Sequence, residues 1–127
     1  MTTVIPAFRV SSRAVLDQWV EAFGLEFVFC VGEADVVNHA ELRLGNGWVM
    51  AGTEKNNEFD RPPGSSSTYW VLDDAAAVDA LHARASQAGA RNVNAPYEPD
   101  YGGRECSFED AGGNTWSFGT YAPGATG

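Results

Sequence analysis

The side chains that could catalyse a reaction or hold a metal ion are few and scattered in this sequence. His39 and Glu41 stand two residues apart, so on a strand both would point to one face, where imidazole and carboxylate can bind zinc, nickel, iron or manganese. Two ligands are too few for a metal site, and the second histidine, His82, falls in a predicted helix. We therefore interpret His39 as a half-exposed strand residue.

The sequence also lacks the patterns of an activated nucleophile. Cys30 and Cys106 are far apart and match no C-x-x-C pattern, and no histidine lies near Cys106 to activate it, so we expect an inert, mostly buried thiol there. There is no Ser-His-Asp order, phosphate-binding loop or dinucleotide-binding glycine pattern. Several carboxylates could act as general bases, but their spacing pairs none of them: Glu26, Glu41, Glu98, Glu105 and Glu109.

The charge balance is acidic, with 17 acidic against 8 basic residues and a net charge of −9. Nucleic acids and anionic membranes require clustered Lys and Arg, so neither is expected as a partner, whereas a cationic ligand is tolerated. The start of the chain has no basic region followed by an apolar core, and no apolar run approaches the roughly 18 residues of a membrane span. We therefore expect a cytoplasmic protein.

The first half of the chain begins with a strand and a helix. Val4–Val10 is a short apolar run that predicts a strand, and Ser11 or Ser12 can cap the helix that follows. Gly24 can end that helix in the left-handed conformation. The predicted buried face of the helix recurs at helical spacing: Val15, Trp19, Ala22 and Phe23.

Three further strands are predicted in the first half, over Leu25–Val31, Val36–Leu44 and Trp48–Ala51. Asn46-Gly47 is a two-residue hairpin signal that joins the last two. The stretch from Gly52 to Ser67 then has turn and linker composition, and we interpret it as the connection between two halves.

The second half repeats the same order of elements. Thr68–Leu72 predicts a strand, Asp73 or Asp74 caps a helix, and Gly89 ends it. A strand near Arg91–Asn94, a loop with two prolines (Pro96 and Pro99) and a closing hairpin follow. The apolar face of this helix carries Val78, Leu81 and Ala85. The duplication predicts one domain, residues 1–127, with module one over 1–52, a linker over 53–66, module two over 67–121 and a tail over 122–127.

The closing hairpin, Tyr101–Tyr121, is the most informative stretch. Two short strands flank a turn with the sequence Asp110-Ala111-Gly112-Gly113-Asn114. With Trp116 after it, this turn resembles the Asp-Pro-x-Gly-Asn-x-Trp pattern of the vicinal oxygen chelate superfamily, which holds glyoxalases, bleomycin-resistance proteins and extradiol dioxygenases. Trp19–Leu25 and Glu41–Met50 resemble parts of its first module. The resemblance implies an α+β fold of two βαβββ modules forming a partial barrel around a cup, and a homodimer.

The resemblance also bears on metal binding. Enzymes of the superfamily hold a divalent metal with one His, Glu or Gln from the first and last strands of each module. These positions fall near Ile5, Met50, Ser67 and Ser117, and none of these is a strong ligand. We therefore expect no metal and no cofactor, as in the metal-free bleomycin-resistance-like branch.

Side chains that share a strand face with these positions are predicted to line the cup. Arg9 is similar to the position where glyoxalase I holds a substrate carboxylate; alternatively, it pairs with a carboxylate of the chain itself. Tyr101 and Arg104 flank two glycines at the cup mouth, where the backbone either approaches a ligand or makes an ordinary tight loop. The predicted ligand-binding residues are Arg9, Trp48, Met50, Ser67, Tyr69, Tyr101, Arg104 and Ser117.

Four tryptophans contribute to this picture. Trp19 and Trp116 match packing aromatics of the superfamily and are predicted in the core, whereas Trp48 and Trp70 could either stack on a flat ligand or pack inside. Aromatic walls with a few hydroxyls suit a small organic molecule. We therefore predict metal-independent sequestration of a ligand or antibiotic. The alternatives are a glyoxalase-like lyase, isomerase or dioxygenase with atypical metal ligands or no metal, and an accessory domain with an exposed apolar patch.

Overall fold

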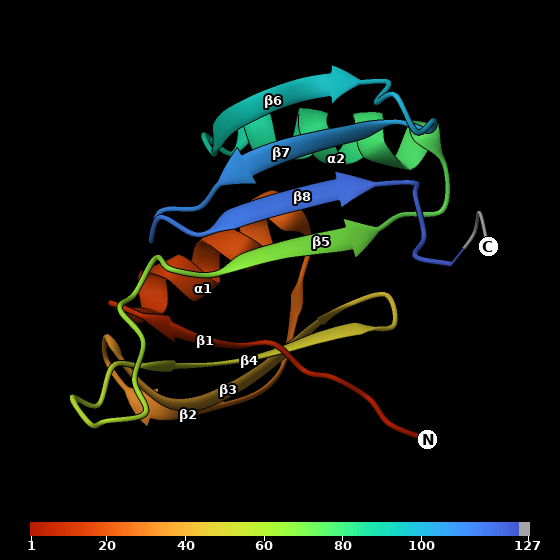
Figure 1. The fold of residues 1–127 in the computed structure, drawn as a ribbon. Helices are drawn as coiled ribbons and strands as arrows, with labels where there is room; N and C mark the ends of the chain where they lie inside the picture. The colour runs from red at the N-terminus through yellow and green to blue at the C-terminus, as the bar shows by residue number, and fades with distance from the viewer. Residues whose placement is uncertain (125–127) are drawn as a thin grey trace.

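The computed structural model describes residues 1–124 and contains two four-stranded mixed sheets, which lie one above the other with the helices behind them (Figure 1). The first sheet has the order β1 (Ala7–Val10), β4 (Gly47–Thr53), β3 (Val36–Leu44) and β2 (Glu26–Glu33). The second has the order β5 (Ser67–Val71), β8 (Thr115–Gly119), β7 (Glu105–Glu109) and β6 (Arg91–Tyr97). In each sheet the first pair is parallel and the others are antiparallel. The predicted α+β fold and the repeated order are confirmed, and both sheets are open.

The helices begin and end largely as the sequence predicts. α1 (Arg13–Gln18) continues into a π-helical turn, Trp19–Phe23, and Gly24 ends it with a φ of 83°. α2 (Ala75–Gln87) is capped by Asp74, which accepts a hydrogen bond from the Ala77 N–H at 2.8 Å. Ser12 is the N-cap residue of α1, one of the two predicted positions, although its side chain makes no capping hydrogen bond.

Three local predictions fail because of proline or turn geometry. The first strand begins at Ala7 rather than Val4, since Pro6 has no N–H and only its carbonyl joins the sheet, accepting from Met50 at 2.9 Å. Pro96 lies inside β6 rather than in a loop, which an edge strand with irregular register tolerates. The predicted Asn46-Gly47 turn is displaced by one residue: Leu44 pairs with Gly47, and the turn consists of residues 45 and 46.

One core joins the two halves. The Trp116 ring lies 4.9 Å from Trp19, 5.5 Å from Phe8 and 5.4 Å from Trp70, measured between ring centroids. Trp19, Phe8 and Trp116 are at most 1% exposed, so the predicted core positions of the two tryptophans are confirmed. Trp70 is also a core residue, so of its two predicted alternatives, stacking on a ligand or packing inside, the structure contains the second. Because these rings come from both sheets and from the first helix, neither half has a core of its own.

Strand alternation leaves the other face of each sheet open. On β5, Trp70 points into the core while its neighbours Tyr69 and Val71 are 40% and 50% exposed.

Within residues 1–124, neither helix is long and apolar enough to cross a membrane.

Candidate functional site

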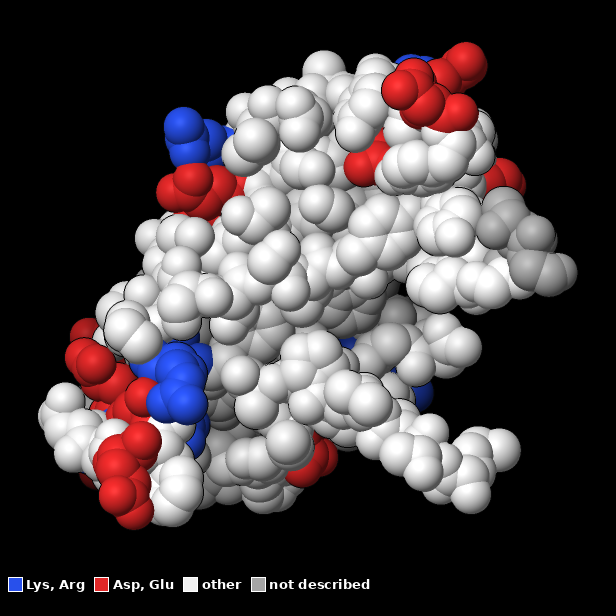
Figure 2. Space-filling model, viewed as in Figure 1, with Lys and Arg blue, Asp and Glu red and all other residues white. Residues whose placement is uncertain are grey.

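The open face of the second sheet carries the predicted polar and aromatic side chains. Register places Tyr69 of β5 opposite Ser117 of β8, and Ser117 opposite Ser107 of β7. The hydroxyls of the two serines lie 2.9 Å apart. Figure 2 shows the same side of the molecule, where charged side chains gather toward the edges and the centre is largely uncharged. A ligand on this surface therefore meets mostly uncharged groups.

A cleft of about 370 Å³ opens between the two sheets. Three predicted site residues, Trp48, Ser67 and Tyr69, line it together with Pro6 and Trp70. We call this space the inter-sheet cleft; its lining is completed by Val4, Gly47 and Thr68. Aromatic walls with a few hydroxyls are the composition of a site for a small organic molecule.

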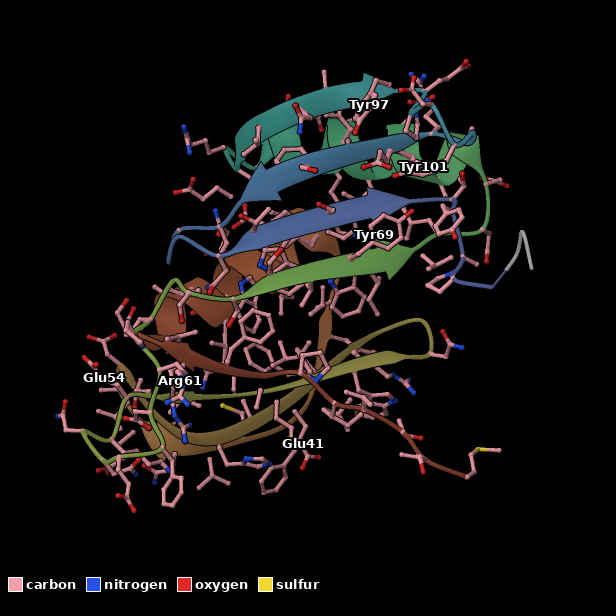
Figure 3. The ribbon with its side chains drawn as sticks, in the orientation of Figure 1. Glu41, Glu54, Arg61, Tyr69, Tyr97 and Tyr101 are labelled. Carbon is pink, nitrogen blue, oxygen red and sulfur yellow. The ribbon has the colours of Figure 1, made fainter. Side chains whose placement is uncertain are left out.

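Next to the inter-sheet cleft, a carboxylate lies among phenols. Glu105 on β7 is only 9% exposed; it accepts a hydrogen bond from the Tyr97 hydroxyl at 3.2 Å and another from the Tyr101 hydroxyl. Figure 3 shows Tyr97, Tyr101 and Tyr69 on the same side of the second sheet, in a row across its strands. We call Glu105 and these three tyrosines the Glu105 cluster. Tyr69 belongs both to this cluster and to the inter-sheet cleft.

The carboxylate perturbs all three phenols. The hydrogen bond to Glu105 raises the pKa of Tyr101 to about 12. The pKa of Tyr97 is raised by burial and by its hydrogen bond to Glu105, and that of Tyr69 by burial and by the nearby charge of Glu105. The phenols therefore stay protonated around the carboxylate at physiological pH.

Two glycines make this arrangement sterically possible. A Cβ on Gly119 would lie 2.4 Å from the Tyr69 hydroxyl and 2.9 Å from the Glu105 Cβ, so only glycine lets Tyr69 cross β8 toward Glu105. A Cβ on Gly103 would lie 2.3 Å from the Thr120 hydroxyl. Gly103 therefore serves the packing of the tight loop against Thr120. Sequence reasoning identified Glu105 only as one of five possible general bases without a partner, and it was not among the predicted ligand-binding residues.

Arg9 is engaged by the segment between the sheets. Its Nε donates to Asp60 at 2.9 Å, and Asp60 also accepts the backbone N–H groups of Lys55 and Asn56. Partial burial would raise the pKa of Asp60, but the hydrogen bonds from Lys55, Arg9 and Asn56 outweigh it and hold that pKa below its usual value. Of the two alternatives, the structure contains the pairing of Arg9 with a carboxylate of the chain itself.

Two other predicted residues lie apart from the inter-sheet cleft. Met50 faces outward from β4 beside Arg9, in a separate depression of about 180 Å³. Arg104 lies on the helix side of the second sheet, where its Nε donates to Asp79 of α2 at 2.7 Å. The structure therefore gathers Trp48, Ser67, Tyr69, Tyr101 and Ser117 around one face and keeps Arg9, Met50 and Arg104 outside that group.

The donor set does not fit a divalent metal at the superfamily positions. The strands β1, β4, β5 and β8 contain no His, Cys, Asp or Glu. On their open faces Ala7 pairs with Met50, and Tyr69 pairs with Ser117. His39 and Glu41 bind each other at 2.9 Å on β3. In the part of the chain that the structure describes, no three or more such side chains come close enough to hold a metal ion.

Comparison with protein families agrees with the fold. The model of the Glyoxalase/Bleomycin resistance protein/Dioxygenase superfamily matches residues 9–118. No functionally curated protein matches the chain.

Solved structures share the whole fold at low sequence identity. TioX from Micromonospora sp. ML1 has a TM-score of 0.75 and 23% identity, with 95% of this chain and 97% of that chain covered. A lactoylglutathione lyase from Agrobacterium tumefaciens has a TM-score of 0.71 and 18% identity, with 94% and 93% covered. A glyoxalase-related enzyme from Fulvimarina pelagi has a TM-score of 0.73 and 16% identity, with 94% and 87% covered. At these identities the likeness establishes the fold alone.

Proposed function

This chain belongs to the Glyoxalase/Bleomycin resistance protein/Dioxygenase superfamily, and we propose that it is a metal-independent member that sequesters a small organic molecule, as bleomycin-resistance-like proteins do. The observation that supports this most directly is the inter-sheet cleft. It joins Trp48, Ser67 and Tyr69, while the four strands that would supply metal ligands offer no His, Cys, Asp or Glu. An antibiotic or a metabolite with a flat ring fits such a space. The proposed location is the cytoplasm.

The roles of the predicted ligand-binding residues follow from their positions. Trp48 and Tyr69 would stack on the ligand, and Ser67 and Ser117 would orient it through their hydroxyls. Tyr101 would close the open end of the surface. Arg9, Met50 and Arg104 would contribute only if the ligand extends beyond the inter-sheet cleft.

Two measurements test this proposal. Elemental analysis for zinc, nickel, iron and manganese, on protein purified without chelators or metal-affinity resin, is expected to find far less than one equivalent per chain. Near one equivalent would overturn metal independence and favour a glyoxalase-like enzyme.

Flat aromatic compounds screened by tryptophan fluorescence are expected to bind the wild type but not Tyr69→Ala. Val71→Ala is the matched control, because Val71 lies on the same strand and face but outside the inter-sheet cleft.

We also propose that the protein is a homodimer. The open face of the first sheet exposes the apolar side chains of Phe29 (49%) and Val31 (45%) on β2, which a second copy would cover. Light scattering after size-exclusion chromatography is expected to give twice the chain mass. A Val31→Asp substitution should shift that mass toward one chain, and an unchanged dimer would remove the first sheet from the interface.

A further inference from the structure

We propose that the Glu105 cluster binds the cationic group of the ligand, a substituted ammonium ion, while the inter-sheet cleft takes an attached apolar ring. This inference rests on the proposed binding function and names the chemical class of its ligand. It comes from one buried carboxylate, the three phenol rings around it, and the side chain that connects them to the inter-sheet cleft.

The carboxylate of Glu105 lacks a cationic partner. Within residues 1–124 no Lys or Arg forms an ion pair with it, whereas Glu109 pairs with Arg91 and Glu26 pairs with Arg43. Its sequence neighbour Arg104 binds Asp79 on the opposite face. A largely buried charge that only neutral hydroxyls contact is costly, and a bound cation would remove that cost. Its oxygens accept two phenol hydrogen bonds and retain further acceptor capacity.

The phenol rings supply the second part of such a site. Tyr69, Tyr97 and Tyr101 remain 40%, 43% and 55% exposed, although the hydroxyls of Tyr97 and Tyr101 are bound to Glu105. Ring faces carry partial negative charge and attract alkylated ammonium groups, which need no hydrogen-bond acceptor. Both the rings and the carboxylate therefore favour a cation, in a protein whose net charge is −9.

Tyr69 connects the two parts of the site. Its ring lines the inter-sheet cleft, and its hydroxyl lies above Gly119, whose ladder partner is Glu105. A ligand whose ring lies beside Trp48 and Tyr69 would therefore have its cationic end directed along Tyr69 toward Glu105. This geometry predicts one molecule with an apolar ring at one end and an ammonium ion at the other.

The test uses three probes of similar size and different charge: benzyltrimethylammonium, benzyl alcohol and benzoate. Calorimetric titration of the wild type is expected to show affinity for benzyltrimethylammonium about tenfold or more above that for benzyl alcohol, with benzoate weakest. Glu105→Gln should abolish this preference and leave benzyl alcohol binding unchanged. Glu109→Gln is the matched control, because it removes a carboxylate from the same strand and face without touching the cluster.

A second variant tests the contribution of the tyrosine rings to cation binding separately from that of the Glu105 charge. Tyr97→Ala removes one ring and is expected to weaken benzyltrimethylammonium binding several-fold, with benzyl alcohol unaffected. Equal affinities of wild type for the cation and the alcohol, or a preference that survives Glu105→Gln in a protein with an unchanged melting temperature, would overturn the inference. Binding of benzyl alcohol that depends on Tyr69 would still leave the proposed function standing. Absence of binding by all three probes, together with a full equivalent of metal, would overturn both.

Discussion

The indole N–H of Trp19 donates to the Asp110 carboxylate at 2.7 Å across a sequence separation of 91 residues. Trp116 donates to the same oxygen at 2.9 Å, and Asn114 and the turn backbone fill the remaining sites of the carboxylate. Asp110 is 4% exposed. Its hydrogen bonds to Trp19 and Trp116 hold the first helix against the closing hairpin. The Asp-x-x-Gly-Asn-x-Trp pattern is thus a hydrogen-bonding unit of the core.

Asp110→Ala is expected to destabilise the protein strongly. It leaves the buried indole N–H groups of Trp19 and Trp116 and an amide of Asn114 without acceptors. Each of these three groups costs roughly 1–3 kcal/mol when left unsatisfied, so we expect a loss of about 3–9 kcal/mol. Urea unfolding measures this. Asp110→Asn should lose less, since it keeps one acceptor oxygen. The exposed Asp100→Ala serves as control, and an Asp110→Ala midpoint close to that control would contradict the role.

The phenol of Tyr101 is expected to titrate near pH 12 in the folded protein. This pKa lies above the ordinary value of about 10, so the contribution of Tyr101 to stability is fully present below pH about 10 and is lost as the pH rises toward 12. The ultraviolet absorbance of tyrosinate follows the ionisation. In Glu105→Gln the same phenol should ionise closer to pH 10, because the accepting carboxylate is gone. A titration curve identical to wild type would mean that the hydrogen bond does not persist in solution.

The two cysteines are expected to differ in reactivity. Cys106 is fully buried, and burial together with the nearby charge of Asp79 raises its thiol pKa to about 11. Cys30 is half-buried on β2, with the Arg13 guanidinium 3.5 Å from its sulfur. Native protein should therefore release about one equivalent of chromophore from a disulfide reagent, and unfolded protein two. In Cys30→Ser the native reaction should disappear; a persisting fast thiol would place Cys106 at the surface.

Arg9→Ala is expected to loosen the segment between the sheets. The variant loses the hydrogen bond between Arg9 on β1 and the Asp60 carboxylate. Because Asp60 also accepts the backbone N–H groups of Lys55 and Asn56, that turn loses its connection to β1. Limited proteolysis should cut residues 54–66 several-fold faster, with little change in the melting temperature. Arg61→Ala is the matched control, since the Arg61 side chain donates its hydrogen bond to the neighbouring Asp60 carbonyl and not to the Asp60 carboxylate. Equal cleavage rates in the two variants would show that Arg9 does not hold this segment.

Local features of the fold could be predicted because they depend on short-range periodicity. The buried face of α2, Val78, Leu81 and Ala85, follows from helical spacing, and the left-handed end at Gly24 follows from the freedom of glycine. Alternation along β5 and β8 likewise placed Tyr69 and Ser117 on one open face. The errors lie where one proline or a one-residue shift of a turn changes the backbone hydrogen bonds, as at Pro6 and at the turn after Leu44.

The sequence by itself thus determined the repeated α+β order, the superfamily and the faces of the strands, because each depends on residues close together along the chain. Only the tertiary structure decided which side chains meet. Glu105 meets Tyr97 and Tyr101 through the β6–β7 register and its loop, and Arg9 meets Asp60 across the chain. Such contacts depend on exact strand register and loop closure, and a shift of one residue would turn each of these side chains to the opposite face.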